Sequence, residues 1–143
     1  MVIVATVTRN KPQRRVVEEG HKLAEAFDEE LHVLNVLQLS EFVDIETDAV
    51  RATDRPEEMQ NVRNKAESIA RGVTSDVTDY AVTVGRIGDP TEQIVQYALE
   101  KDASYVIVGG RKRTPTGKAI FGSITQSVLL EAEQPVVTVL QSD

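Results

Sequence analysis

The residues best suited to chemistry lie in one glycine-bearing, basic stretch between positions 109 and 125. It opens with Gly109-Gly110, contains the positive side chains Arg111, Lys112, Arg113 and Lys118, and closes with Gly122-Ser123-Ile124-Thr125. Glycine lets a backbone approach a ligand closely. A helix that starts near Ser123 would offer unpaired N–H groups and a positive dipole end to an anion. The composition favours a phosphate site, and the alternative is a solvated loop with an ordinary helix cap.

This stretch is not a P-loop, although Gly117-Lys118 resembles the end of one. The P-loop pattern needs a glycine five residues before Gly117 and a serine or threonine directly after Lys118. Lysine occupies position 112 and alanine occupies position 119. The stretch would also follow the fourth strand of the chain and not the first.

The elements that position this stretch alternate between strands and helices. Apolar runs predict strands at residues 2–7, 31–39, 80–84, 105–108 and 136–140. Apolar residues at helical spacing predict helices at residues 13–28, 56–73, 92–101 and 123–131. The alternation predicts an α/β fold, a doubly wound five-stranded parallel sheet with helices on both faces. Ligands bind such sheets beyond the carboxyl ends of the strands, and residues 1–143 are expected to form one domain.

The other candidate residues point to structure more than to chemistry. The chain has 2 His and no Cys, so no thiolate metal site or cysteine nucleophile is available, and His21 and His32 are expected at the surface or half-buried. Asp89 precedes Pro90 and is predicted to cap a helix. A further set of acidic residues lacks the glycine and the final glutamate of a calcium loop: Asp44, Glu46, Asp48, Asp54, Glu57 and Glu58. No Ser-His-Asp order or nucleophile elbow is present, so the chain is not expected to be an enzyme, with weak ATP hydrolysis left open.

Charge and composition limit the partners. The chain has 23 Asp plus Glu against 16 Lys plus Arg, a net charge of −7, which is the opposite sign from most broad nucleic-acid binders. It has 3 Phe, 3 Tyr and no Trp, too few aromatics for a base-stacking platform. No apolar run approaches the roughly 18 residues of a membrane span, and the N-terminus lacks the order of a signal peptide. We therefore expect a cytoplasmic protein without nucleic-acid or membrane partners.

From Val2 to Leu140 the chain resembles a universal stress protein domain of the UspA type. Four segments carry the resemblance: Gly88-Asp89-Pro90, Ala103–Gly109, Phe121–Leu129 and Gln134–Val139. The resemblance implies a stress-response module with the family's fold, which is similar to that of adenine-nucleotide alpha hydrolases. It also implies a homodimer built through the last strand, residues 136–140.

One branch of that family binds ATP through a glycine, two residues, a second glycine, nine residues, and then glycine with serine or threonine. Gly109 and the pair Gly122-Ser123 match this pattern, but Lys112 stands at the second glycine. The family's acidic residue at the end of the first strand is also missing, since the chain reads Ala5-Thr6-Val7-Thr8.

The resemblance predicts a site for ATP or another adenine nucleotide with Mg²⁺, in which Lys112 could neutralise phosphate. Its expected residues are Ala5, Thr6, Thr8, Val36, Gly109, Gly110, Lys112, Gly122, Ser123, Ile124 and Thr125. No metal-ligating or catalytic side chain is expected among them. The alternative, favoured by Lys112 and the missing acid, is a dimer without nucleotide that acts as an interaction or regulatory protein.

Overall fold

The computed structural model of the chain describes residues 1–8, 13–38, 56–112 and 119–142. Its elements, in chain order, are β1 (Val2–Thr6), α1 (Arg14–Phe27), β2 (Glu30–Leu37), α3 (Pro56–Thr74), β3 (Val82–Ile87), α4 (Pro90–Glu100), β4 (Ala103–Lys112), β5 (Ala119–Ile120), α5 (Ser123–Glu131) and β6 (Val136–Ser142). The alternation of strands and helices therefore follows the order that the sequence predicts.

The parallel strands lie in the order β3-β2-β1-β4-β6, and the two-residue β5 pairs antiparallel with β4. The chain builds outward from β1 through β2 to β3, and then returns to place β4 on the other side of β1. This reversal makes the gap between β1 and β4 the switch point of the sheet, where α/β proteins of this kind bind ligands. The predicted doubly wound parallel sheet is confirmed.

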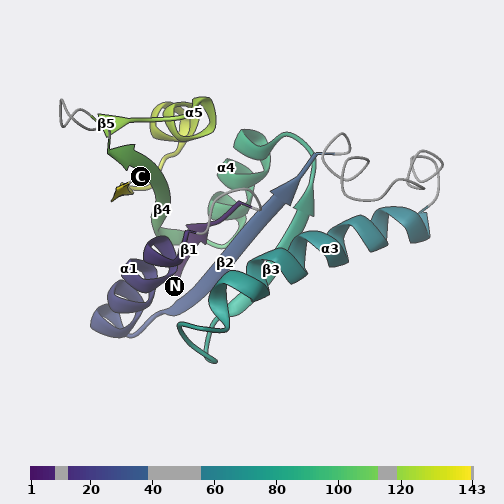
Figure 1. Ribbon diagram of the computed structural model, residues 1–143, viewed down its shortest axis with the longest axis horizontal. Helices are drawn as coiled ribbons and strands as arrows, with labels where there is room; N and C mark the ends of the chain where they lie inside the picture. Colours follow the sequence, from purple (N-terminus) through teal and green to yellow (C-terminus); the bar gives the residue numbers. More distant parts are fainter. Residues whose placement is uncertain (9–12, 39–55, 113–118, 143) are drawn as a thin grey trace.

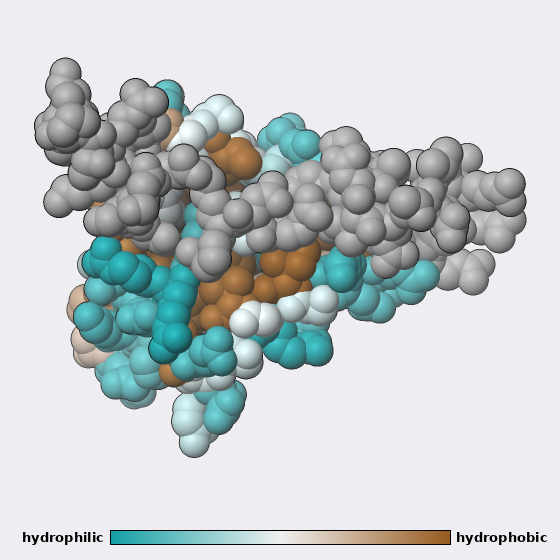
Figure 2. All heavy atoms as spheres, in the orientation of Figure 1, coloured by the Kyte–Doolittle hydropathy of each residue, from teal (hydrophilic) through white to brown (hydrophobic). Residues whose placement is uncertain are grey.

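Helices cover both faces of the sheet (Figure 1), with α1 and α3 on one face and α4 and α5 on the other. Successive residues of β1 point to opposite faces. Ile3 packs in a cluster with Val16 of α1, whereas Val4 packs with Ile94 of α4. Figure 2 shows apolar atoms reaching the surface between α1 and α3, while the outer faces of these helices are hydrophilic. Burial of these two apolar layers fixes the sheet and thereby the ends of its strands.

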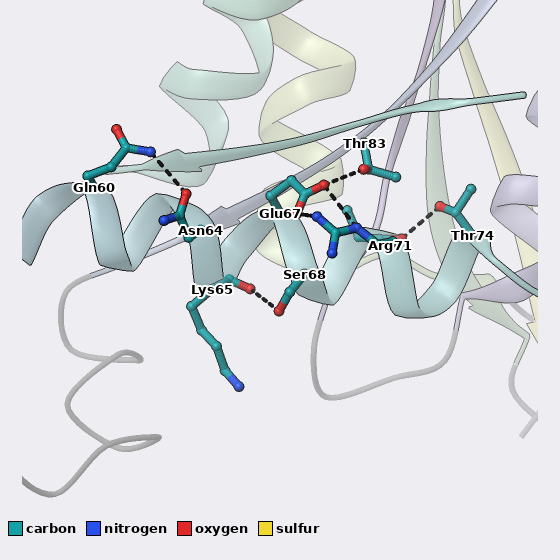
Figure 3. Close-up of polar contacts among 9 residues, drawn as sticks. Gln60, Asn64, Lys65, Glu67, Ser68, Arg71, Thr74 and Thr83 are labelled. Carbon is teal, nitrogen blue, oxygen red and sulfur yellow. Dashed lines mark hydrogen bonds and ion pairs between the residues drawn. The ribbon is translucent and has the colours of Figure 1, made fainter. Parts of the chain in front are cut away.

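α3 lies unusually close to the edge strand β3. A side chain at Gly85 would run into the backbone of α3 at Arg63 and Glu67, so only glycine fits there. Beside this contact the Glu67 carboxylate accepts hydrogen bonds from Arg71 and from the Thr83 hydroxyl, the latter at 2.6 Å (Figure 3). The hydrogen bond from Arg71 is the main reason why the pKa of Glu67 lies below its ordinary value. This network ties α3 to β3.

β4 is longer than the sequence predicts. The prediction ended the strand at Val108 and began a loop at Gly109, which is wrong, because β4 continues to Lys112. The reason is long-range pairing: β6 runs alongside as far as the pair Lys112 and Ser142. The short strand β5, which returns along the end of β4, was not predicted either.

β3 also differs from its prediction. It spans Val82–Ile87 and not residues 80–84, because its ladder with β2 continues to the pair Leu37 and Ile87. Tyr80, which the prediction placed in the strand, is 92% exposed and precedes β3.

Candidate functional site

The turn into α5 presents an open helix N-terminus. Gly122 is the N-cap residue, and no side chain of its own can cap the first N–H groups of α5. Gly122 and Ser123 are exposed, and a Cβ at Gly122 would meet no atom of the described residues within 4 Å. An anion could therefore approach this backbone directly, with the helix dipole favouring negative charge.

Thr125 fastens this helix to the sheet. Its hydroxyl donates a hydrogen bond of 2.9 Å to the carbonyl oxygen of Gly109, and Thr125 is only 9% exposed. The sequence placed Thr125 among the ligand-binding residues, but its hydroxyl already donates to Gly109. Thr125 therefore positions the first turn of α5 beside β4.

Gly109 and Gly110 serve close packing on opposite faces of β4. A Cβ at Gly109 would lie 3.0 Å from the side-chain nitrogen of Gln13, just before α1. A Cβ at Gly110 would lie 2.9 Å from the ring of Phe121, just before Gly122. The two glycines thus let the start of α1 and the start of α5 approach the same end of β4.

The ends of β1 and β2 complete this region of the sheet. The Thr6 hydroxyl donates to the carbonyl oxygen of Ile107 at 3.3 Å, which joins β1 to β4. Thr8 is exposed, whereas Ala5 is fully buried beneath α1. Val36 packs partly buried on the opposite face, in the cluster that includes residues of α4. Of the predicted site residues, Thr6, Gly109 and Thr125 are thus linked around the end of β4, and Ala5 and Val36 point to opposite sides of the sheet.

Asn35 of β2 is a residue that the sequence analysis missed. Its side-chain nitrogen donates a 2.8 Å hydrogen bond to the carbonyl oxygen of Val7, directly after β1, and the residue is 2% exposed. Among the described residues its Oδ1 has no hydrogen-bond partner. The available signal was a lone amide inside the apolar run Leu31–Leu37.

The basic part of the predicted site is described only in its backbone. Lys112 pairs with Ala119 of β5 and with Ser142 of β6. Residues 113–118 and the side chain of Lys112 lie outside the described part of the chain, so the role of Lys112 in neutralising phosphate stays a prediction.

Comparison with known proteins identifies the family. The sequence profile of the universal stress protein family matches residues 1–139. This chain belongs to the universal stress protein family. A curated universal stress protein of Mycolicibacterium smegmatis is 39% identical over 51 residues, which is 36% of this chain and 39% of that relative. The alignment thus spans less than half the length of that relative.

Solved structures agree with the universal stress protein fold. One from Archaeoglobus fulgidus superimposes with a TM-score of 0.62 at 26% identity, over 96% of both chains. The fold is also similar to an A. fulgidus universal stress protein in complex with dAMP, with a TM-score of 0.59, 19% identity, and coverage of 96% of this chain and 94% of that one. A universal stress protein in complex with cAMP gives a TM-score of 0.57 at 15% identity, covering 98% of this chain and 96% of that chain.

The other side chains that the sequence analysis considered for chemistry, Asp89, His21 and His32, make contacts within the fold of this universal stress protein. Asp89 caps α4, as predicted, by accepting a 3.0 Å hydrogen bond from the Glu92 N–H. The surface or half-buried position expected for His32 is wrong: it is 7% exposed, and its Nδ1 lies 2.6 Å from the hydroxyl of Tyr97. His21 is partly exposed beside Glu25, in keeping with its prediction.

The described residues contain neither a metal-binding cluster nor a membrane-spanning helix. No cluster of three or more His, Asp or Glu side chains there could hold a metal ion. No helix in the same ranges combines the length and apolar character needed to cross a membrane. The acidic set from Asp44 to Glu58 falls outside the described side chains.

Proposed function

We propose that this universal stress protein is a non-catalytic binding module that holds an adenine nucleotide, or another phosphate ligand, at the turn from β4 into α5. The observation that carries the proposal is the open N-terminus of α5, fastened to β4 by the hydrogen bond from Thr125 to Gly109. The complexes of similar universal stress proteins with dAMP and cAMP support an adenine nucleotide as the ligand.

Each residue has a defined part in this binding. The backbone N–H groups of Ser123 and Ile124 would receive a phosphate, and the Ser123 hydroxyl would donate a further hydrogen bond. Lys112 would supply positive charge, while Thr6 and Thr8 would lie toward the nucleoside. Mg²⁺ would arrive with a triphosphate and be held mainly by its oxygens.

Calorimetric titration with ATP and Mg²⁺ tests the proposal. We expect a dissociation constant at or below about 100 μM, which corresponds to roughly −5.5 kcal/mol. Ser123→Ala should weaken binding about 3- to 10-fold, the effect of one hydrogen bond. Ser68→Ala is the matched control, because Ser68 is an exposed serine of α3 that bonds only to its own helix, at Lys65. An absence of heat for the wild type, or an equal loss in both variants, would contradict the proposed site.

The open edge of β6 favours a second function, as a homodimer that acts through interactions. The N–H of Val106 donates to the carbonyl oxygen of Pro135 at 3.0 Å, so the backbone groups of odd-numbered residues in β6 face β4. Those of Val136 and Thr138 consequently face away from the sheet, as do those of Leu140, whose carbonyl oxygen accepts a hydrogen bond from the Arg15 side chain of α1. Unpaired groups along an edge invite another strand, and two copies of β6 would form a symmetric pair.

The cytoplasm is the proposed location of this dimer. A cysteine-free, acidic chain suits a reducing and crowded compartment. If the site does not bind nucleotide, the dimer remains as a regulatory surface. Nothing in the described site supplies a general base, so ATP hydrolysis is not part of the proposal.

A further inference from the structure

Only the nitrogen of the Asn35 side-chain amide has a hydrogen-bond partner among the described residues. Its nitrogen donates to the carbonyl oxygen of Val7 at 2.8 Å. Its Oδ1 is buried and has no hydrogen-bond partner among the described residues. An unpaired buried acceptor costs about 1–3 kcal/mol, and native proteins contain few of them. A hydrogen-bond donor that reaches this oxygen would therefore remove an energetic cost.

The chemistry of that partner is fixed by Val7. A carbonyl oxygen can only accept hydrogen bonds, so the half of the amide that faces Val7 must be the NH₂ group. A flipped amide would place two oxygens at the 2.8 Å separation now occupied by nitrogen and oxygen. The unpaired group of Asn35 is consequently an acceptor, and its missing partner must be a donor.

Asn35 lies at the end of the sheet where the proposed site is found. Val7 directly follows β1, and its side chain packs with Val16 and Val17 in the first turns of α1. The residue just before α1, Gln13, also covers Gly109 of β4. The Asn35 amide thus lies on the α1 side of the switch point, and the neighbouring Val7 is apolar and 2% exposed. Asn35 brings an acceptor to this position.

We propose that Asn35 Oδ1 accepts a hydrogen bond from the bound nucleotide, either from the exocyclic amine of adenine or from a ribose hydroxyl. This inference rests on the proposed function and names the residue that reads the nucleoside. A site that presents a buried acceptor rejects an analogue that lacks the donor, because the acceptor is then left unpaired. Guanine and hypoxanthine carry a carbonyl where adenine carries its amine. That carbonyl oxygen would face Asn35 Oδ1, and no hydrogen bond can form between two acceptors.

Calorimetry with a series of nucleotides tests this inference and distinguishes the two donors. ITP lacks the amine, and 2′-deoxy-ATP and 3′-deoxy-ATP each lack one hydroxyl. We expect the wild type to bind one of these analogues at least 10-fold more weakly than ATP. In Asn35→Leu, which keeps the volume but has no acceptor, ATP and that analogue should bind with equal affinity. Asn64→Leu is the control, because Asn64 is an exposed residue of α3 that bonds to Gln60; it should keep the wild-type preference.

The outcomes separate this inference from the proposed function. If the wild type binds ATP and all three analogues equally, Asn35 reads no donor, while nucleotide binding stands. If the preference persists in Asn35→Leu, another group reads the nucleoside and the assignment is overturned. If no nucleotide binds, both proposals fail. The wild-type series needs no variant, so equal binding of ATP and all three analogues would overturn the inference even if Asn35→Leu does not fold.

Discussion

Replacing Gly85 with alanine should separate α3 from β3. The added Cβ would lie well under 3.0 Å from the carbonyl oxygen of Arg63 and from the backbone nitrogen of Glu67, and 2.9 Å from the Cβ of Ala66. Two of these neighbours are helix backbone, which cannot rotate aside as a side chain would. The whole helix would therefore have to retreat.

The size of the effect follows from that movement. Ordinary van der Waals contact begins near 3.4 Å, so α3 would have to move by about 1 Å. A gap of that size forfeits a quarter to a half of each dispersion contact. Val62, Ala66 and Ala70 are all fully buried along this helix and would share the loss. We expect Gly85→Ala to lower the free energy of unfolding by about 3 kcal/mol, the upper end of ordinary overpacking.

Gly72→Ala provides a control with the opposite expected sign. Gly72 is an exposed residue of the same helix, and within the described ranges no atom would lie within 4 Å of a Cβ there. Alanine should therefore stabilise the protein by about 0.5–1 kcal/mol through helix propensity and reduced unfolded-state entropy. Urea unfolding of both variants measures the two changes on one scale. A loss below about 1 kcal/mol for Gly85→Ala, or an equal loss for Gly72→Ala, would refute the close approach of α3.

Three further changes test the network, the interior and the edge of the sheet. The hydrogen bond from Arg71 lowers the pKa of Glu67 in the folded chain. The ionised Glu67 therefore stabilises the fold fully above its unfolded pKa, and this stabilisation is lost as pH falls through the folded pKa. In Glu67→Gln, the urea midpoint should consequently decrease less than in the wild type below about pH 5. Tyr97→Phe should lower the free energy of unfolding by about 1–2 kcal/mol, because Nδ1 of His32 loses its partner while Nε2 keeps Glu30. Burial raises the pKa of Tyr97, so the wild type, but not Tyr97→Phe, should lose stability as pH rises above about 10. Thr138→Pro removes an N–H that faces away from β4, so the proposed β6 pairing loses a hydrogen bond while the fold keeps its own. Light scattering should then show a monomer, and urea unfolding should be unchanged. A dimer that persists in this variant would exclude pairing through β6.

Sequence reasoning succeeded where the signal was local. Pro56 begins α3, Asp89 caps α4 and Ser123 begins α5, as predicted from residue types at helix starts. It failed where a distant partner decides the outcome. β4 continues through Gly109 because β6 lies beside it, and His32 is buried because Tyr97 of α4 satisfies its ring. Neither partner is visible in the local pattern.

The sequence by itself determined the order of the elements, the doubly wound sheet and the placement of a helix start at Gly122-Ser123 after the fourth strand. Those properties follow from hydrophobic periodicity and from cap residues, which act over a few positions of the chain. Only the tertiary structure decided which polar groups remain available at that turn. The hydroxyls of Thr6 and Thr125 donate to Ile107 and Gly109, and Asn35 Oδ1 has no partner in the described part of the chain. Such availability depends on contacts between residues far apart in the chain, because a hydrogen bond is set by distance in space.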